Sequence, residues 1–402
     1  MRKIVSGVVI LFLACMCAGS VATQILAATK PSVKEVSISQ SDGDFVYGVS
    51  STKVSFKITK KCKQATVYII DEEGNKVYKK VISKIKGNKT YSLTWNGKES
   101  SGDVASTGIY KAMVVVGKST MTSTNGVLFY ATSDFSKGNG SESNPYEVAN
   151  AEQLKAVSKH NGRSFVLTQD IDCAGVSYVT LFSAEDQFSG SFDGQGHTIK
   201  NISISGSSER VGLFRQTTSS AVIQNVNLSD CMISGGKWVA ALVGANSGTI
   251  KNCSVTNCVV NGSSIDVGAL TGYNGGKILS CTTTGNTISG GDDYVGSMAG
   301  YLDSTGYVSE CKSSQDIISC KDYDCGGICG YSKGTIMRCE VKDDTIGGDW
   351  GIGGIAGKNE GTIANCVVYD ESGLIKGGSA VHGIAGSDQG TSSNNSYYGE
   401  LS

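Results

Sequence analysis

The sequence predicts an all-β protein, with a β-sandwich at the N-terminal end followed by a parallel β-helix, a solenoid in which short strands stack coil upon coil. Glycine recurs at intervals of 27 to 30 residues from Gly244 to Gly386, each time inside a near-copy of one segment. Apolar residues keep fixed distances from that glycine. Short β-branched runs alternate with Gly, Ser, Asn and Asp, and no window has a helical period.

The repeat predicts the solenoid, because a unit of about 28 residues cannot bury its apolar face alone and must stack on its neighbours. Val or Ile, and once Cys, stands five residues before the glycine, and Leu, Met or Ile stands two residues before it. These columns should line one interior. Glycine is expected to serve the turns, since it takes positive φ at little cost. The repeat glycines are Gly244, Gly272, Gly300, Gly330, Gly357 and Gly386.

Residues 1–28 have the composition of a secretory signal peptide. Arg2 and Lys3 precede an apolar run, and small residues follow it. No later segment approaches the roughly 18 consecutive apolar residues needed to cross a bilayer. We therefore expect a protein that is secreted or held at the cell surface, without a membrane span.

Charge divides the mature chain into two parts. Residues 29–130 carry 16 lysines against 8 acidic residues, whereas residues 131–402 carry 17 basic against 28 acidic residues. The basic part suits an anionic wall polymer or surface polysaccharide, and a solvated surface without a partner is the alternative. Neither part has a motif for nucleic acids.

Residues 29–130 are predicted to form the sandwich, because five stretches alternate apolar with polar residues between turn signals. The stretches are 54–59, 65–70, 77–82, 91–95 and 110–116. Segment 94–116 resembles the Ig-like domain of flagellar hook-capping proteins through Trp95-Asn96-Gly97, Gly102, Val104, Gly108 and Tyr110. The resemblance implies an Ig-like fold with the tryptophan in its core. The signal peptide argues against a flagellar role.

Residues 131–149 are predicted to be a linker, and the β-helix is expected over 150–402, with about seven to nine coils. Asn150 three residues before Gln153 signals the start of a short helix. That helix should bury Ala151, Leu154 and Val157 and cover the first coil, because an uncovered solenoid end exposes unpaired strand edges.

The order of motifs in this region resembles the secreted β-helices that carry GLUG repeats, first noted in immunoglobulin A protease-like surface proteins. The motifs are NPYEVANAEQL (144–154), FVLTQDID (165–172), FSGSFDGQGHTIKNISI (188–204) and repeats such as GALTGYNGGKILSC (268–281). The resemblance implies a right-handed coil, a secreted or surface location, and adhesion or carbohydrate contact. It does not imply proteolysis, because the sequence has no zinc-binding H-E-x-x-H motif.

Five cysteines recur at one position of successive repeats, namely Cys253, Cys281, Cys311, Cys339 and Cys366. Parallel rungs about 4.8 Å apart point such side chains the same way, which suits a buried column of thiols better than disulfides. Val226 one coil earlier fits that interpretation. Cys325, in a column of Val and Ile, is also interpreted as apolar. Disulfides between neighbouring coils and a metal site are the alternatives.

One turn of the repeat gathers carboxylates and aromatic rings. Eight residues before the glycine, three aspartates align on successive coils, namely Asp292, Asp322 and Asp349. The same turn carries Trp238, Asp266, Asp293, Tyr294, Tyr323, Asp324 and Trp350. Carboxylates bind sugar hydroxyls and aromatic faces pack on sugar rings, so these ten residues form the candidate glycan site. The three aligned aspartates could instead hold Ca²⁺, and a solvated turn without a ligand is the third interpretation.

These features predict a binding or adhesin-like protein without catalysis. Its expected partners are host or cell-wall glycans or surface proteins, it is expected to be a monomer, and calcium is the one cofactor considered. The alternative is a polysaccharide lyase or glycoside hydrolase, since both use β-helices. Arg338 lies on a different strand from the aspartates, which leaves a lyase without an obvious base. The column Tyr273, Tyr301 and Tyr331 is expected to stack within the solenoid.

Overall fold

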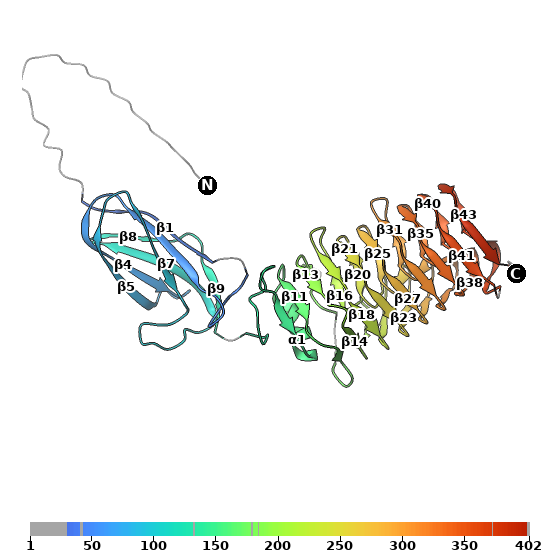
Figure 1. The fold of residues 1–402 in the computed structure, drawn as a ribbon, viewed down its shortest axis with the longest axis horizontal. Coiled ribbons are helices and arrows are strands. Elements are labelled where there is room, and N and C mark those ends of the chain that lie inside the picture. The colour runs from blue at the N-terminus through green and yellow to red at the C-terminus, as the bar shows by residue number, and fades with distance from the viewer. Residues whose placement is uncertain are drawn as a thin grey trace, which may run out of the picture.

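The computed structural model describes residues 30–40, 43–131, 133–177, 180–183, 185–371 and 373–399, and the predicted signal peptide lies outside them. The protein is an all-β molecule in which a sandwich and a parallel solenoid of about eight turns lie end to end (Figure 1). The predicted fold class is confirmed. The right-handed sense of the coil, which the family resemblance implies, stays a prediction.

The sandwich consists of two sheets, ordered β1-β3-β6 and β2-β9-β7-β4-β5, with β8 added to β7. Their strands pair antiparallel except β2 and β9, which pair in parallel. Its strands are β1 (Val33–Gln40), β2 (Phe45–Val46), β3 (Thr52–Ile58), β4 (Cys62–Ile70), β5 (Lys76–Ile85), β6 (Thr90–Trp95), β7 (Gly108–Val116), β8 (Ser119–Thr122) and β9 (Val127–Tyr130). The five predicted stretches fall in β3 to β7. Trp95 is buried, packs against Phe45 and Tyr110, and donates from Nε1 to the Lys98 carbonyl at 2.7 Å, so its role is structural.

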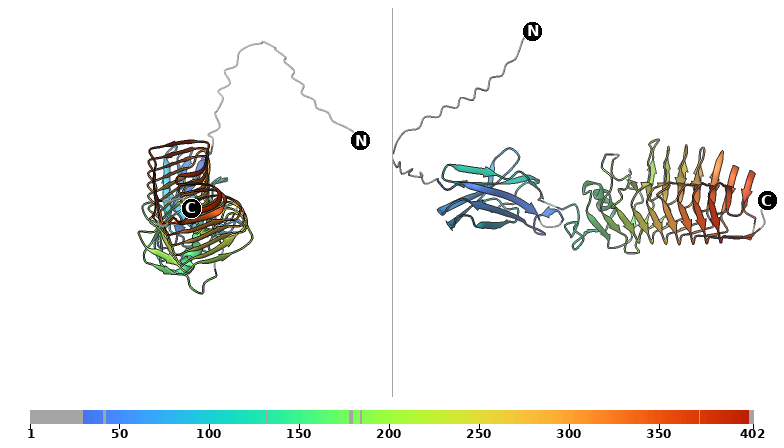
Figure 2. Two further views of the ribbon diagram at one scale, coloured as in Figure 1. Left: turned by 90° about the vertical axis from the view of Figure 1, so that its right-hand side faces the viewer. Right: turned by 90° about the horizontal axis from the view of Figure 1, so that it is seen from above.

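Four parallel sheets form the walls of the solenoid, which Figure 2 shows end-on and from above. The first contains β10 (Tyr146–Val148), β11 (Ser164–Leu167), β13 (Ser191–Asp193), β17 (Val222–Gln224), β21 (Thr249–Lys251), β26 (Lys277–Leu279), β31 (Tyr307–Ser309), β36 (Thr335–Met337), β40 (Thr362–Ala364) and β44 (Thr391–Ser393). The second contains β12 (Ile171–Asp172), β14 (Thr198–Lys200), β18 (Asn227–Ser229), β22 (Ser254–Thr256), β27 (Thr282–Thr284), β32 (Lys312–Ser314), β37 (Glu340–Lys342), β41 (Val367–Asp370) and β45 (Ser396–Gly399).

The candidate site lies within the third wall, and the fourth wall follows it along each coil. The third sheet contains β15 (Ser203–Ser205), β19 (Met232–Gly235), β23 (Val259–Gly262), β24 (Val267–Gly268), β28 (Thr287–Gly290), β29 (Val295–Gly296), β33 (Ile317–Cys320), β34 (Tyr323–Gly326), β38 (Thr345–Gly353) and β42 (Ile375–His382). The fourth contains β16 (Phe214–Gln216), β20 (Val243–Asn246), β25 (Thr271–Asn274), β30 (Ala299–Leu302), β35 (Cys329–Ser332), β39 (Ala356–Asn359) and β43 (Ala385–Asp388).

The predicted apolar columns are the interior of the solenoid. Val267, Val295, Cys325 and Ile352 pair in register on adjacent coils, and all four are buried. Val308 pairs with Ile278 on one side and Ile336 on the other, so the two-residue insertion in that repeat is accommodated outside the strands.

The repeat glycines allow close packing and do not provide positive φ. A Cβ on Gly272 would lie 2.3 Å from the carbonyl carbon of Trp238 in the preceding coil, and Gly357 has the same relation to Asp324. The expectation that glycines serve the turns through positive φ therefore does not hold for these six, although it holds for others such as Gly285 and Gly351. Positive φ angles six residues before the repeat glycine occur at Trp238 (57°), Asp266 (65°), Tyr294 (64°) and Asp324 (62°), and at a glycine, Gly351 (70°).

The helix α1 (Ala151–Ala156) and the short 3-10 helix that follows it (Val157–Lys159) cover the first coil, as predicted. Asn150 caps α1 by accepting from the Gln153 backbone N–H at 2.9 Å, and Leu154 is fully buried. No helix in the described segments has the length and apolar character needed to span a bilayer. The expected linker 131–149 contributes to the solenoid, because it contains β10 and the buried ring of Phe135.

A buried carboxylate joins the sandwich to the solenoid. Asp44 accepts a hydrogen bond from the Tyr146 hydroxyl at 2.6 Å and from Nε of Arg163 at 2.8 Å, and its Oδ2 lies 2.8 Å from Nδ1 of His160. Burial opposes ionisation, but the hydrogen bonds of His160 and Tyr146 and the charge of Arg163 outweigh it and lower the pKa of Asp44. The two units are therefore tied by an ionised group.

The cysteine column is a ladder of buried, free thiols, as the repeat register predicts. Its sulfurs are not purely apolar, since Sγ of Cys281 donates to the Leu279 carbonyl at 3.3 Å, and the other four cysteines repeat this contact. Burial raises the pKa of the Cys281 thiol above its usual value, which keeps it protonated and unreactive.

Candidate functional site

All ten predicted site residues lie at one corner of the coil, where the chain turns within the third sheet, and Tyr323 and Asp324 belong to β34 while Asp349 and Trp350 belong to β38. The structure separates the ten residues into two groups. The residues with positive φ, Trp238, Asp266, Tyr294 and Asp324, pack beside the tyrosine column on β25, β30 and β35; we name this set the packed ladder. The second set, which we name the exposed turn, comprises the exposed residues Tyr323, Asp349 and Trp350 with the half-buried Asp292 and Asp322. Asp293 lies between the two.

The rings of the packed ladder cover one another. Tyr273 and Tyr301 stack with ring centroids 5.7 Å apart and an interplanar angle of 13°. Trp238 lies 5.3 Å from Tyr273, and Tyr294 lies 5.2 Å from Tyr331. The tyrosine column therefore stacks within the solenoid, as expected, and its faces are largely taken by other rings.

Cations occupy the faces of Trp238. The Arg210 guanidinium lies 4.4 Å from the ring centroid and the Lys237 ammonium 5.0 Å from it. Nε1 of Trp238 donates to Oδ2 of Asp266 at 2.8 Å. This tryptophan is satisfied by its own chain, which argues against the predicted role in stacking on a sugar.

Asp266 and Asp324 are buried carboxyl groups with unusual electrostatics. Each is 4% exposed, and Oδ1 of each is buried without a hydrogen-bond partner in the described part of the chain. Burial raises the pKa of both groups to about 7, although Lys237 beside Asp266 and Lys358 beside Asp324 oppose the rise. Both carboxyl groups therefore hold a proton up to neutral pH.

The exposed turn presents aromatic faces to solvent. Tyr323 is 53% exposed and Trp350 is 36% exposed, and their rings lie 6.0 Å apart at 69°. The two residues pair in register between β34 and β38. The backbone N–H of Trp350 donates to the Asp322 carbonyl, and that of Asp322 donates to the Asp292 carbonyl, so successive coils place these residues side by side.

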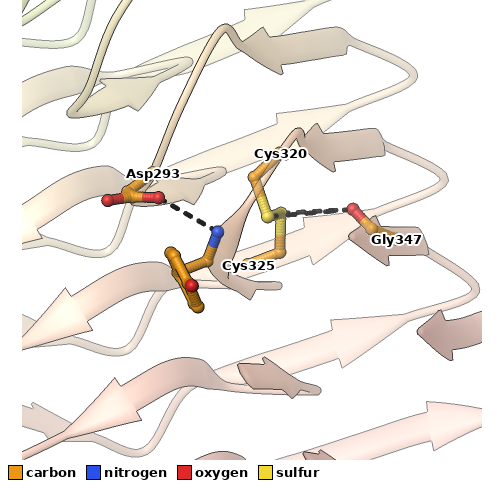
Figure 3. Close-up of a disulfide and its surroundings, with 5 residues drawn as sticks. Asp293, Cys320, Cys325 and Gly347 are labelled. Carbon is orange, nitrogen blue, oxygen red and sulfur yellow. Dashed lines mark hydrogen bonds between the residues drawn. A yellow bond between two sulfur atoms is a disulfide. The ribbon is translucent and has the colours of Figure 1, made fainter. Parts of the chain in front are cut away.

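A disulfide closes the loop that carries this surface. Cys320 and Cys325 are bonded, and Oδ1 of Asp293 accepts from the Tyr323 backbone N–H at 3.0 Å (Figure 3). Loop 320–325 is thus held on two sides. The interpretation of Cys325 as a simple apolar residue was wrong, because it is bonded to Cys320, which takes the register position of Gly290 in the preceding coil. Burial, with the Asp322 and Asp292 carboxylates, raises the pKa of Asp293.

The predicted calcium site does not fit the structure. Asp292, Asp322 and Asp349 lie on successive coils, but the described segments contain no group of three His, Cys, Asp or Glu side chains arranged to hold a metal ion. A Ca²⁺ ion needs six to eight oxygen ligands around one point. The three carboxylates therefore lack the convergence that calcium requires.

Sequence reasoning missed the cations that complete the packed ladder. Arg210 holds the position of Trp238 one coil earlier, which the bridge between Val211 and Val239 confirms. The periodic signal failed there because Arg215 stands opposite Gly244 in the register, in place of a repeat glycine. Lys358 pairs in register with Tyr331, so the column that contains the tyrosines could have revealed it.

Comparison with known proteins supports both units at the level of fold. Residues 43–119 match the FlgD Ig-like domain family. Over 144 residues, 32% of this chain, the sequence is 33% identical to halomucin of Haloquadratum walsbyi. The matched region is 2% of that much longer protein.

Two solved structures are similar to parts of the chain. A candidate immunoglobulin A1 protease from Bacteroides ovatus matches with a TM-score of 0.53 and 22% identity, covering 66% of this chain and 87% of its own. At that identity the likeness shows the solenoid fold alone. FlgD of P. aeruginosa covers 24% of this chain and 72% of its own at 22% identity, with a TM-score of 0.17. That score carries no structural argument, and the GLUG assignment of the repeats stays a prediction.

Proposed function

We propose that this protein is a secreted or cell-surface binding protein that contacts glycans through the exposed turn and does not catalyse a reaction. The observation that carries the proposal is the exposed pair of Tyr323 and Trp350 beside carboxylates of the same turn. Large exposed aromatic rings that the chain does not cover mark interaction surfaces. The predicted signal peptide supports the location.

The chemistry of the exposed turn suits a sugar polymer. Aromatic rings pack on the C–H faces of sugar rings, and carboxylates accept hydrogen bonds from hydroxyl groups. Asp292, Asp322 and Asp349 succeed one another at about 4.8 Å per coil, so they span about 10 Å along the solenoid axis. A linear ligand lying along the axis would reach all three.

The fixed loop favours binding of such a ligand. The Cys320–Cys325 bond and the Asp293 hydrogen bond restrict the backbone of Asp322 and Tyr323 before any ligand arrives. A site that is already ordered loses less conformational entropy on binding. This is the physical reason to prefer the exposed turn over the packed ladder, whose rings are already occupied.

Glycoside hydrolysis is the second candidate, because Asp266 and Asp324 have pKa values of about 7 and could serve as general acids. They lie two coils apart, about 10 Å along the axis. Inverting glycosidases separate their carboxyl groups by about 6.5 to 9.5 Å. However, the unpartnered Oδ1 atoms are buried, which keeps them from a substrate and favours binding. The likeness to a candidate protease supports no proteolysis, since the H-E-x-x-H motif is absent.

A glycan array tests the proposal. The Trp350→Ala/Asp322→Ala double variant should lose binding and keep the thermal midpoint of the wild type, because substitutions at exposed turns move stability little. The matched control is Tyr398→Ala/Asp343→Ala, which removes an exposed ring and a half-exposed carboxylate elsewhere on the solenoid. Binding that survives the double variant unchanged contradicts the proposal. Release of reducing ends or unsaturated products from a polysaccharide panel would support the enzyme instead.

A further inference from the structure

The end of the sandwich that points away from the solenoid is a dense lysine surface. Two turns pack together there, residues 59–61 after β3 and residues 86–89 after β5. The Asn88 backbone N–H donates to the Ile58 carbonyl at 2.7 Å, and a Cβ on Gly87 would lie 2.8 Å from Cα of Lys60. We name this surface the basic tip, and its members are Lys60, Lys61, Lys63, Lys84, Lys86 and Lys89.

The charges of the basic tip are not neutralised by the protein. All six lysines are exposed, and among the described residues none of them forms an ion pair with a carboxylate. Lys118 joins the same end, because its neighbour Ser119 accepts from the Val33 backbone N–H at 3.0 Å. Glu35, opposite Lys57 in the ladder of β1 and β3, is the acidic residue close to this end.

The acidic turn of the sandwich lies at the opposite end. Asp71, Glu72 and Glu73 form the turn that follows β4, whereas the basic tip begins where β4 begins. A strand of nine residues is about 27 Å long from its first to its last residue. That exceeds the screening length of about 8 Å in physiological salt. The acidic turn therefore leaves the field of the basic tip largely intact.

The composition of the basic tip indicates the class of polyanion. The sandwich contains lysines but no arginine, so it lacks the planar forks that bind phosphates bidentately. The large exposed aromatic residues of the described chain, Tyr323, Trp350 and Tyr398, all lie in the solenoid. Among the described residues the tip offers no fully exposed ring for stacking nucleic-acid bases, since Tyr91 beside Lys86 is half-buried and stacks on Phe56. The lysine ammonium groups are point charges on flexible side chains, and each can pair with a separate carboxylate or sulfate group along a polymer.

We propose that the basic tip binds an acidic polysaccharide, at a second site that is independent of the exposed turn. Binding brings anionic groups among six like charges and so relieves their mutual repulsion. The solenoid carries 17 basic against 28 acidic residues over 131–402, so it repels the same polymer and leaves the tip as its point of contact. The protein can then hold one polymer at each end.

Binding of the mature full-length protein to immobilised polygalacturonate and to dextran sulfate tests this proposal. Wild type should bind both polymers but not neutral dextran, and the logarithm of its affinity should fall linearly with the logarithm of salt concentration. The Lys60→Gln/Lys61→Gln/Lys63→Gln variant removes half of the six charges, so it should lower that slope by about half. The control Lys53→Gln/Lys79→Gln/Lys111→Gln removes three exposed lysines outside the tip and should bind as wild type does.

Three outcomes would overturn the proposal. They are no binding to either acidic polymer, equal weakening by the tip variant and its control, and equal or tighter binding to duplex DNA or to vesicles that contain phosphatidylserine. Thermal unfolding of both triple variants should match wild type, so that lost binding reports lost charge. The Trp350→Ala/Asp322→Ala variant should keep its affinity for polygalacturonate, which separates this site from the glycan site of the exposed turn.

Discussion

Replacing the buried Asp266 carboxyl group with an amide should change the pH dependence of stability. The amide side chain of the Asp266→Asn variant would keep an oxygen that accepts the Trp238 Nε1–H, now at 2.8 Å, but it could not ionise. In the wild type, burial raises the pKa of Asp266 to about 7 from its usual 3.8. The folded protein therefore binds a proton between about pH 4 and pH 7 that the unfolded chain releases.

The sign of the effect follows from proton linkage. Because the folded state binds more protons in this window, the contribution of Asp266 to the free energy of unfolding falls as pH rises from about 4 to about 7. A pKa difference of this size lowers the free energy of unfolding by about 4 kcal/mol at pH values above both pKa values. The Asp266→Asn variant does not lose this stability, because its amide does not ionise. It should match the wild type at pH 4 and exceed it by about 2 to 4 kcal/mol at pH 8.

Urea unfolding followed by circular dichroism at pH 4, 6 and 8 measures the difference. The exposed Asp349→Asn substitution on the same turn is the matched control and should shift nothing beyond a few tenths of a kcal/mol. If the profiles of Asp266→Asn and wild type run parallel from pH 4 to pH 8, Asp266 is ionised in the folded protein, and our account of the packed ladder is wrong.

Three further predictions concern the core and the junction. The Cys281→Ser substitution should lower the free energy of unfolding by about 1 kcal/mol, because a hydroxyl replaces a buried sulfur but can still donate to the Leu279 carbonyl. Thermal or urea unfolding measures this change, and an unchanged free energy would place Cys281 outside the core. Denatured, unreduced protein should expose the ladder thiols to a thiol reagent, and reduction should release two more, those of Cys320 and Cys325; a larger increase on reduction would reveal disulfides in the ladder. The Asp44→Asn substitution should lower the free energy of unfolding by about 3 kcal/mol at pH 7, because it removes the charge of one partner from a buried ion pair. This loss should shrink as pH falls below about 3.8, where the carboxyl group of the unfolded chain is protonated. A loss that does not depend on pH would refute the ionised junction.

Local and periodic features could be predicted from the sequence because their physical causes are local or repeated. The cap formed by Asn150 and Gln153, the interior column around Ile278, and the buried Trp95 each follow from spacing along the chain. The stacking of Tyr273 on Tyr301 also follows, since a parallel register places equivalent residues on neighbouring rungs. The ten candidate site residues were correctly assigned to one turn for the same reason.

The division of that turn into two surfaces could not be predicted from spacing. A residue with positive φ directs its side chain differently from its neighbour, so Tyr294 packs in the ladder although Asp292 stands only two positions away. The role of the repeat glycines was missed because it depends on the backbone of another coil, which lies 2.3 Å from where a Cβ on Gly272 would be.

The sequence by itself determined the solenoid, its register and the strong charge difference between the two units, since periodicity and composition express these directly. Only the tertiary structure decided which rings and carboxylates remain available to a ligand. Exposure depends on what other coils and turns bring close, as Arg210 does for Trp238 and the Cys320–Cys325 bond does for the loop of Tyr323. Likewise, six of the sixteen lysines scattered over 29–130 form one directed surface, because antiparallel strands bring distant turns to the same end of the sandwich.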